Sequence, residues 1–152
     1  MTDNQATQGL LDFVRACPTM FHTAAAIGRR LEEAGFAYLP EGEAWHMEPG
    51  GRYYTSRNNS SVIAVKVGSE LDSYHFQLAA AHGDSPCFKV KAVPELAGPG
   101  DYLRLDVEAY GGMIDHTWPD RPLGVAGSAL VREGARVENH TVAQDHDEAN
   151  TM

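Results

Sequence analysis

The residues of this chain best placed to do chemistry are an imidazole and a carboxylate two positions apart, His82 and Asp84. They follow the apolar run 76–81, and Gly83 and Pro86 interrupt that run, so both are expected where a buried strand ends. A neutral imidazole is a good ligand for a divalent transition metal, and a carboxylate on its second nitrogen fixes its tautomer. In an extended backbone residues i and i+2 point to the same side, so the spacing allows His82 to be a metal ligand that Asp84 orients. The same spacing also fits a surface turn, and one histidine cannot hold a zinc ion alone.

Apolar periodicity predicts the elements that would position this pair. They are a helix over 9–17, a helix that starts at 19 or at 22–23 and runs to 34 with Gly35 as its cap, a hairpin of strands over 51–57 and 61–67, and a central strand from 74 or 75 to 82. Asn58 and Asn59 favour the hairpin turn. The strand over 61–67 is too apolar for an edge, so we expect it inside a sheet.

The second half of the chain is rich in strand signals. Strands are expected over 88–93 and 102–110, and two short strands over 130–138 are expected around Gly134. The stretch 94–100 is the richest in proline and glycine and is the best candidate for a linker and domain boundary.

Composition excludes several classes of function. The 152 residues suffice for one domain with a core, and 21 acidic against 12 basic residues give a net charge of −9, which argues against nucleic-acid binding. The sequence has no apolar run near the roughly 20 residues that a membrane span needs, and its first residues do not have the pattern of a secretory leader, so neither feature is expected. With only Cys17 and Cys87, a disulfide framework is not expected, so the composition favours a cytoplasmic protein.

Three ordered segments resemble the aspartyl aminopeptidase family of zinc exopeptidases. The segment 81–91 reads Ala-His-Gly-Asp-Ser-Pro-Cys-Phe-Lys-Val-Lys, and it is similar to the metal-site segment of that family. The segment 110–127, with its Tyr-Gly-Gly, Thr-Trp, Asp-Arg-Pro-Leu and Ala-Gly, is similar to a second family segment, and 18–23 with 34–36 to the opening helix pair. The departures are Gly83, where the family usually has threonine, and Pro119, where it usually has phenylalanine.

The resemblance implies a role for each residue of the pair. His82 would ligate one ion of a two-zinc site, and Asp84 would be the catalytic acidic residue that orients or polarises it. The bridging aspartate, the pair of glutamates that includes the general base, and the final histidine and aspartate would come from a longer chain. The family implies a peptide substrate, removal of amino-terminal residues including acidic ones, and a homo-oligomer.

The resemblance also implies an α/β fold class. A helix pair and part of a mixed sheet of the zinc-exopeptidase type would form the amino-terminal part of the catalytic domain, over 1–93. An inserted β-rich domain of the dimerisation type would start over 94–139, and 140–152 would be a polar tail for which disorder is expected.

Alternatives remain open for the function and for other candidate ligands. Three alternatives are open for a chain that lacks most of the metal ligands. It is part of an aminopeptidase and has no appreciable peptidase activity alone, or it serves as an inactive binding or assembly partner. In the third alternative it has no stable fold, because its sheet edges are unpaired. His22 is interpreted as a capping or packing residue. Asp115, His116 and Asp120 are interpreted as structural residues because their spacing fits no zinc signature. His140 and His146 are assigned to a disordered tail rather than to a loose metal site.

Overall fold

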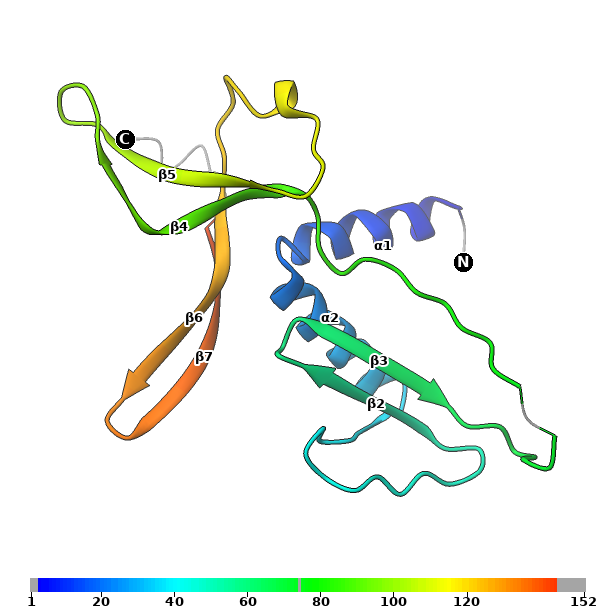
Figure 1. Ribbon diagram of the computed structural model, residues 1–152. Helices are drawn as coiled ribbons and strands as arrows, with labels where there is room; N and C mark the ends of the chain where they lie inside the picture. The colour runs from blue at the N-terminus through cyan, green and yellow to red at the C-terminus, as the bar shows by residue number, and fades with distance from the viewer. Residues whose placement is uncertain (1–2, 74, 145–152) are drawn as a thin grey trace. The chain divides into compact units, whose positions relative to one another are not determined.

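A computed structural model describes residues 3–73 and 75–144 of the chain (Figure 1). One compact unit comprises residues 1–84 and 123–152, and a second comprises residues 85–122. The elements are α1 (Asp3–Ala16), α2 (Met20–Glu33), β1 (Ala37–Tyr38), β2 (Arg52–Arg57), β3 (Ser61–Lys66), β4 (Cys87–Ala97), β5 (Leu103–Tyr110), the 3-10 helix η1 (Asp115–Thr117), β6 (Val125–Glu133) and β7 (Arg136–Gln144). Two helices and a mixed sheet confirm the predicted α/β class.

The predicted helix pair is confirmed, and its boundaries follow local chemistry. α1 begins at Asp3, several residues before the predicted start, and on its polar face the Gln8 side-chain amide donates to Asp12 one turn later at 2.8 Å. Gly35 ends α2 with φ of 79°. Its N–H donates to the Glu32 carbonyl, and the Phe36 N–H donates to the Leu31 carbonyl, both at 2.9 Å, which is the Schellman pattern.

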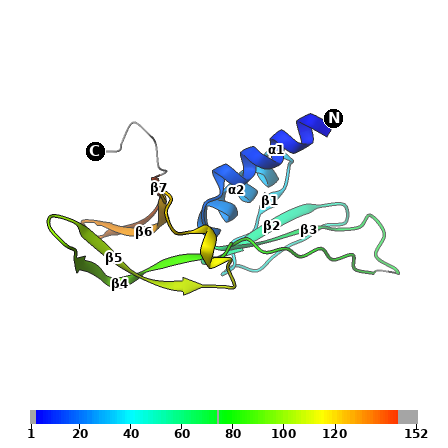
Figure 2. The same ribbon diagram turned by 90° about the horizontal axis from the view of Figure 1, so that it is seen from above.

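The core of the first unit lies between α2 and a three-stranded sheet in the order β1-β2-β3 (Figure 2). β1 runs parallel to β2, and β2 runs antiparallel to β3. Gly28 lies against the sheet, at a position where a Cβ would be at an ordinary contact distance of 3.5 Å from the Tyr54 ring. Tyr54 is 7% exposed, and its hydroxyl donates to Glu32 Oε1 at 2.6 Å.

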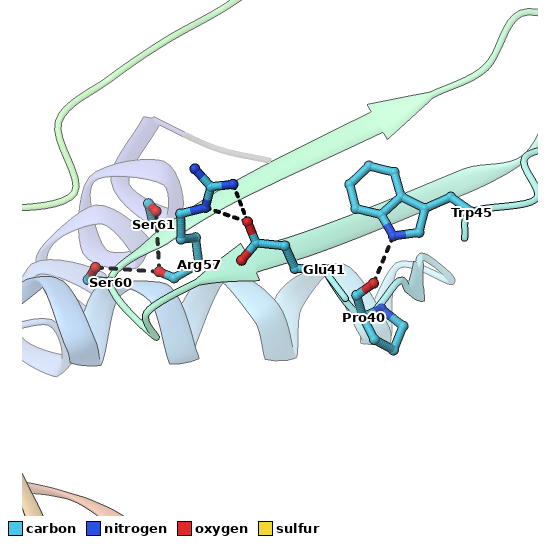
Figure 3. A network of polar contacts seen from close by, with 6 residues as sticks. All are labelled: Pro40, Glu41, Trp45, Arg57, Ser60 and Ser61. Atoms are coloured by element: carbon cyan, nitrogen blue, oxygen red, sulfur yellow. Dashed lines mark hydrogen bonds and ion pairs between the residues drawn. The ribbon is translucent and has the colours of Figure 1, made fainter. Parts of the chain in front are cut away.

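The β2–β3 hairpin is confirmed with its predicted turn. Asn58 and Asn59 have φ of 53° and 54°, a region that asparagine tolerates better than most residues, and the Ser60 N–H donates to the Arg57 carbonyl at 3.1 Å. The connection from β1 to β2 folds back beside this hairpin (Figure 3). There Glu41 pairs with Arg57, and the Trp45 indole N–H donates to the Pro40 carbonyl at 2.8 Å.

The central strand predicted to end at His82 is wrong as a strand. Residues 75–82 belong to none of the described sheets, although both views show this segment running back beside β3 (Figures 1 and 2). A β-strand needs backbone hydrogen bonds to a neighbouring strand as well as an extended backbone. An apolar run in the sequence indicates the extended backbone but does not specify the neighbouring strand. For the same reason β3 is an edge strand of the described sheet, contrary to expectation.

The second unit contains the antiparallel pair of β4 and β5. β5 confirms the predicted strand over 102–110, but β4 runs to Ala97 and so includes much of the stretch predicted as a linker. A register shift between Val90 and Glu95 accommodates Pro94, which has no N–H to donate to a ladder. The proposed domain boundary near residue 94 stays a prediction.

β6 and β7 form an antiparallel hairpin around Gly134, which confirms the predicted strand pair. Both strands are longer than expected. Residues 140–144, assigned to the polar tail, belong to β7, where the adjacent β-branched residues Thr141 and Val142 pair with Ser128 and Gly127. The rest of that tail, residues 145–152, lies outside the described residues.

Replacing Tyr54 with phenylalanine is expected to lower the free energy of unfolding by about 1 kcal/mol near neutral pH, since it removes the bond to Glu32. That bond, together with burial, raises the pKa of Tyr54 from 10 to about 12. Between pH 10 and 12 the unfolded tyrosine ionises before the folded one, so the stability that Tyr54 adds is complete below pH 10 and is lost as the pH rises to 12. Urea denaturation of both proteins across this range checks the expectation; a difference that grows with pH would contradict it.

Replacing Gly98 with alanine is expected to destabilise the β4–β5 turn by about 1–3 kcal/mol. A Cβ at residue 98 would lie 2.5 Å from the backbone oxygen of Tyr102, which accepts the Gly98 N–H at 2.9 Å. Gly112→Ala is the matched control, because a Cβ there meets nothing within 4 Å. Hydrogen exchange of β4 and β5 should accelerate only in the first variant, and equal exchange in both would refute the clash.

Candidate metal site

His82 and Asp84 are in direct contact, as their spacing suggested. The Nδ1 of His82 lies 3.0 Å from Oδ1 of Asp84, with the histidine side chain 93% exposed and the aspartate side chain 30% exposed. A carboxylate at Nδ1 favours the tautomer that carries the proton there, which leaves Nε2 with its lone pair. The pair therefore presents one oriented nitrogen that is accessible to a metal ion.

The start of α2 and the β2–β3 turn position this pair. Gly83 lies between its two members, and a Cβ at that position would lie 3.7 Å from Thr23 Cγ2 and 4.0 Å from the Ser60 carbonyl oxygen. These are ordinary contact distances, so the site has room for the β-carbon of the threonine that the family usually carries here. Gly83 thus lies close to two segments that are distant in the sequence.

The start of α2 is itself braced by hydroxyl groups. The Thr19 carbonyl accepts the Thr23 N–H at 2.9 Å and the Thr23 hydroxyl at 3.1 Å. The Thr19 hydroxyl bonds to Nδ1 of His22 at 2.8 Å, in agreement with the capping or packing role predicted for His22. The sequence analysis missed Thr23 as a support of the site, although a threonine four residues after an N-cap threonine is a usable signal.

The other candidate ligands belong to other elements of the chain. Asp115 and His116 are in η1 and Asp120 follows it with φ of 58°, all in the second unit. His140 is in β7 with its Nε2 3.8 Å from a Glu138 carboxylate oxygen, and His146 is outside the described residues. Within residues 3–73 and 75–144 no three histidine, cysteine, aspartate or glutamate side chains gather closely enough to hold a metal ion.

The donor chemistry fits one ligand position and no more. A structural or catalytic zinc ion takes three or four protein ligands, and here the described residues offer one imidazole with its carboxylate partner.

The described helices include none long and apolar enough to cross a membrane.

Comparison with known sequences identifies one family. The family described as aminopeptidase I zinc metalloprotease (M18) matches residues 13–148. Two proteins called probable M18 family aminopeptidase 2 are similar: that of Pseudomonas paraeruginosa is 49% identical over 140 residues, and that of Pseudomonas fluorescens is 44% identical over 139 residues. Each alignment covers 91% of this chain and 32% of the relative, so the chain spans about a third of the length of the curated relatives it matches.

Solved structures show the same similarity. Ape4, in its complex with Nbr1, is 38% identical with a TM-score of 0.87, and the match covers 91% of this chain and 27% of that chain. The S. cerevisiae mApe1 dodecamer is 27% identical with a TM-score of 0.77 over 90% of this chain and 32% of that chain. The arrangement of this chain therefore recurs inside proteins about three times its length.

We expect the isolated chain to bind no zinc through His82 tightly enough to survive dialysis, because a single imidazole supplies too few ligands. Zinc content after dialysis should be the same for the wild type and for His82→Ala. A stoichiometric ion that His82→Ala removes would contradict the one-ligand geometry.

Proposed function

Because this chain belongs to the aminopeptidase I zinc metalloprotease family (M18), we propose that it forms the amino-terminal part of a metallo-aminopeptidase. The reaction would be the removal of single residues from the amino terminus of peptides. The observation that carries the proposal is the contact of Asp84 with Nδ1 of His82, within the segment that resembles the family's metal site.

His82 is the metal ligand in this proposal, and Asp84 acts through it. By accepting the Nδ1 proton in a hydrogen bond, Asp84 holds the imidazole in one tautomer, restricts its rotation and makes Nε2 a better donor. Bound zinc would supply a polarised scissile carbonyl and a water of lowered pKa.

The remaining ligands and the general base would come from the part of the family fold that these 152 residues do not span. The share of the relatives covered, 32% in each case, supports this assignment. Acidic amino-terminal residues are a candidate substrate class because the resemblance is to aspartyl aminopeptidases. The residues described here would by themselves give no appreciable turnover.

We further propose that the complete protein is a cytoplasmic homo-oligomer. One similar protein, mApe1, forms a dodecamer, which supports the oligomer. Cys17 and Cys87 are both free thiols, as a reducing compartment would keep them.

The alternative function is that of a catalytically inactive partner in assembly. This alternative is supported by the many large apolar side chains that are exposed among the described residues, including Leu10, Val14 and Leu130. Such surfaces mark interaction sites when they are contiguous.

The test is a chimera in which this chain replaces the matching third of the P. paraeruginosa relative. We expect zinc-dependent hydrolysis of amino-terminal residues from peptides, a loss of at least about 100-fold with His82→Ala, and a loss of about 10–100-fold with Asp84→Asn. Metal content should fall with the first substitution as well as activity.

His116→Ala is the matched control, since this histidine lies in η1, outside the pair, and should leave activity unchanged. An active chimera that tolerates His82→Ala would refute the assigned ligand. A folded, zinc-loaded chimera without activity would favour the inactive partner.

A further inference from the structure

Gly83 joins the proposed ligand His82 to its partner Asp84, and its geometry does not require glycine. Its backbone is not in the positive-φ region, and a Cβ there would meet its neighbours at ordinary contact distances. Glycine has more backbone freedom than any other residue, so a segment centred on it leaves its folded conformation more readily. The two functional groups are thus joined through the most flexible residue type, at a position where the family usually has threonine.

The side chain of Thr23 occupies the space next to Gly83. Apart from the chain neighbours of Gly83, the described residues place two atoms within 4 Å of the point where its Cβ would be: Thr23 Cγ2 at 3.7 Å and the Ser60 carbonyl oxygen at 4.0 Å. The Ser60 oxygen is a backbone atom, so Thr23 contributes the side chain. A γ atom lies about 1.5 Å beyond a Cβ. A γ methyl of residue 83 directed toward α2 would therefore compete with the Thr23 methyl for the same space.

The Thr23 side chain is itself held in one orientation. It is 9% exposed, and its hydroxyl donates at 3.1 Å to the Thr19 carbonyl, which also accepts the Thr23 N–H at 2.9 Å. A β-branched side chain has few rotamers in a helix, and a bond from its hydroxyl to the carbonyl four residues earlier selects one of them. With the hydroxyl fixed in this way, the methyl has a single direction, which is the one toward Gly83.

We propose that Thr23 is a positioning residue for the candidate metal site and that its methyl substitutes for the side chain missing at residue 83. By packing against Gly83, the methyl restrains the backbone between His82 and Asp84 and so maintains the 3.0 Å contact of imidazole and carboxylate. The effect on zinc rests on the proposed function, because it requires His82 to be a metal ligand. The restraint on residues 82–84 is independent of that function.

The alternative role of Thr23 is to brace the first turn of α2, and the two roles use different atoms. Bracing depends on the hydroxyl, whereas positioning depends on the methyl. Thr23→Ser keeps the hydroxyl and removes the methyl. Thr23→Val has the shape of threonine and lacks the hydroxyl, and the Thr19 carbonyl keeps its bond from the N–H of residue 23. The two variants therefore separate the two roles.

The first experiment measures the 152-residue chain without metal. NMR relaxation gives the backbone order parameters of residues 82–84, and the ring nitrogen shifts of His82 give its tautomer. In Thr23→Ser we expect the order parameters to fall toward about 0.6, the value of flexible backbone, and the population with a proton on Nδ1 to decrease. Thr23→Val should match the wild type. A larger effect of the valine variant, or no effect of the serine variant, would overturn the proposal.

A double-mutant cycle tests whether the two side chains share one space. In the Thr23→Ala background, Gly83→Thr can place its γ methyl where the Thr23 methyl was, so we expect it to restore the order parameters that Thr23→Ala lowers. In the wild-type background the same substitution competes with Thr23 and should gain less. Equal effects in both backgrounds would refute the shared space. Thr141→Ser is the matched control, since it removes a methyl from an exposed threonine in β7 and should leave residues 82–84 unchanged.

The second experiment measures zinc affinity in the chimera with the P. paraeruginosa relative. Thr23→Ser should lower the affinity by about 10-fold, the lower end of the loss that follows removal of a group that orients a ligand, and Thr23→Val should not lower it. Unchanged affinity in the serine variant would overturn the role of Thr23 in metal binding. A chimera that tolerates His82→Ala refutes the proposed function instead, and the metal-free chain still decides whether Thr23 restrains residues 82–84.

Discussion

The hydrogen bond between the buried Tyr54 and Glu32 is the interaction on which the first unit depends. Tyr54 is buried where α2 packs on the sheet, and Gly28 lies on the same helix face, at a position where a Cβ would make ordinary contact with the tyrosine ring at 3.5 Å. Glu32 lies one turn further along that face and accepts the phenol proton at 2.6 Å, so the ring is buried without leaving its hydroxyl unsatisfied. This bond joins α2 to β2 in one register.

That register also determines where the candidate site lies. With α2 bonded to β2 through Glu32, its first turn places Thr23 beside Gly83, and the β2–β3 turn places Ser60 there. His82 and Asp84 are therefore located by the α2–β2 packing even though neither residue contributes to it. A site built on three distant segments is only as well ordered as the packing that joins them.

Local signals explain which parts of the fold the sequence could predict. Gly35 as a cap, Asn58 and Asn59 as a turn, and the Gly134 hairpin all involve bonds between residues a few positions apart, so the pattern contains the whole cause. The contact of His82 with Asp84 belongs to the same class, because the two residues are only two positions apart. The apolar run before His82 differs, since a strand there would need hydrogen bonds to a neighbouring strand that no local pattern specifies. Likewise the nearness of Gly83 to Thr23 depends on the register of α2, and no spacing in the sequence encodes it.

The bulge that carries Pro94 in β4 has a consequence for solubility. The β4–β5 ribbon exposes apolar side chains and backbone edges, a combination that promotes growth of sheets between molecules. Proline withholds a donor from any incoming strand, and the shift between Val90 and Glu95 breaks the regular spacing of the ladder. Lys91 adds a charge, paired with Asp106 at 3.0 Å, that an incoming chain would have to desolvate. This ribbon is thus guarded against indiscriminate edge-to-edge aggregation, a safeguard that the hydrophobic edge of β3 lacks.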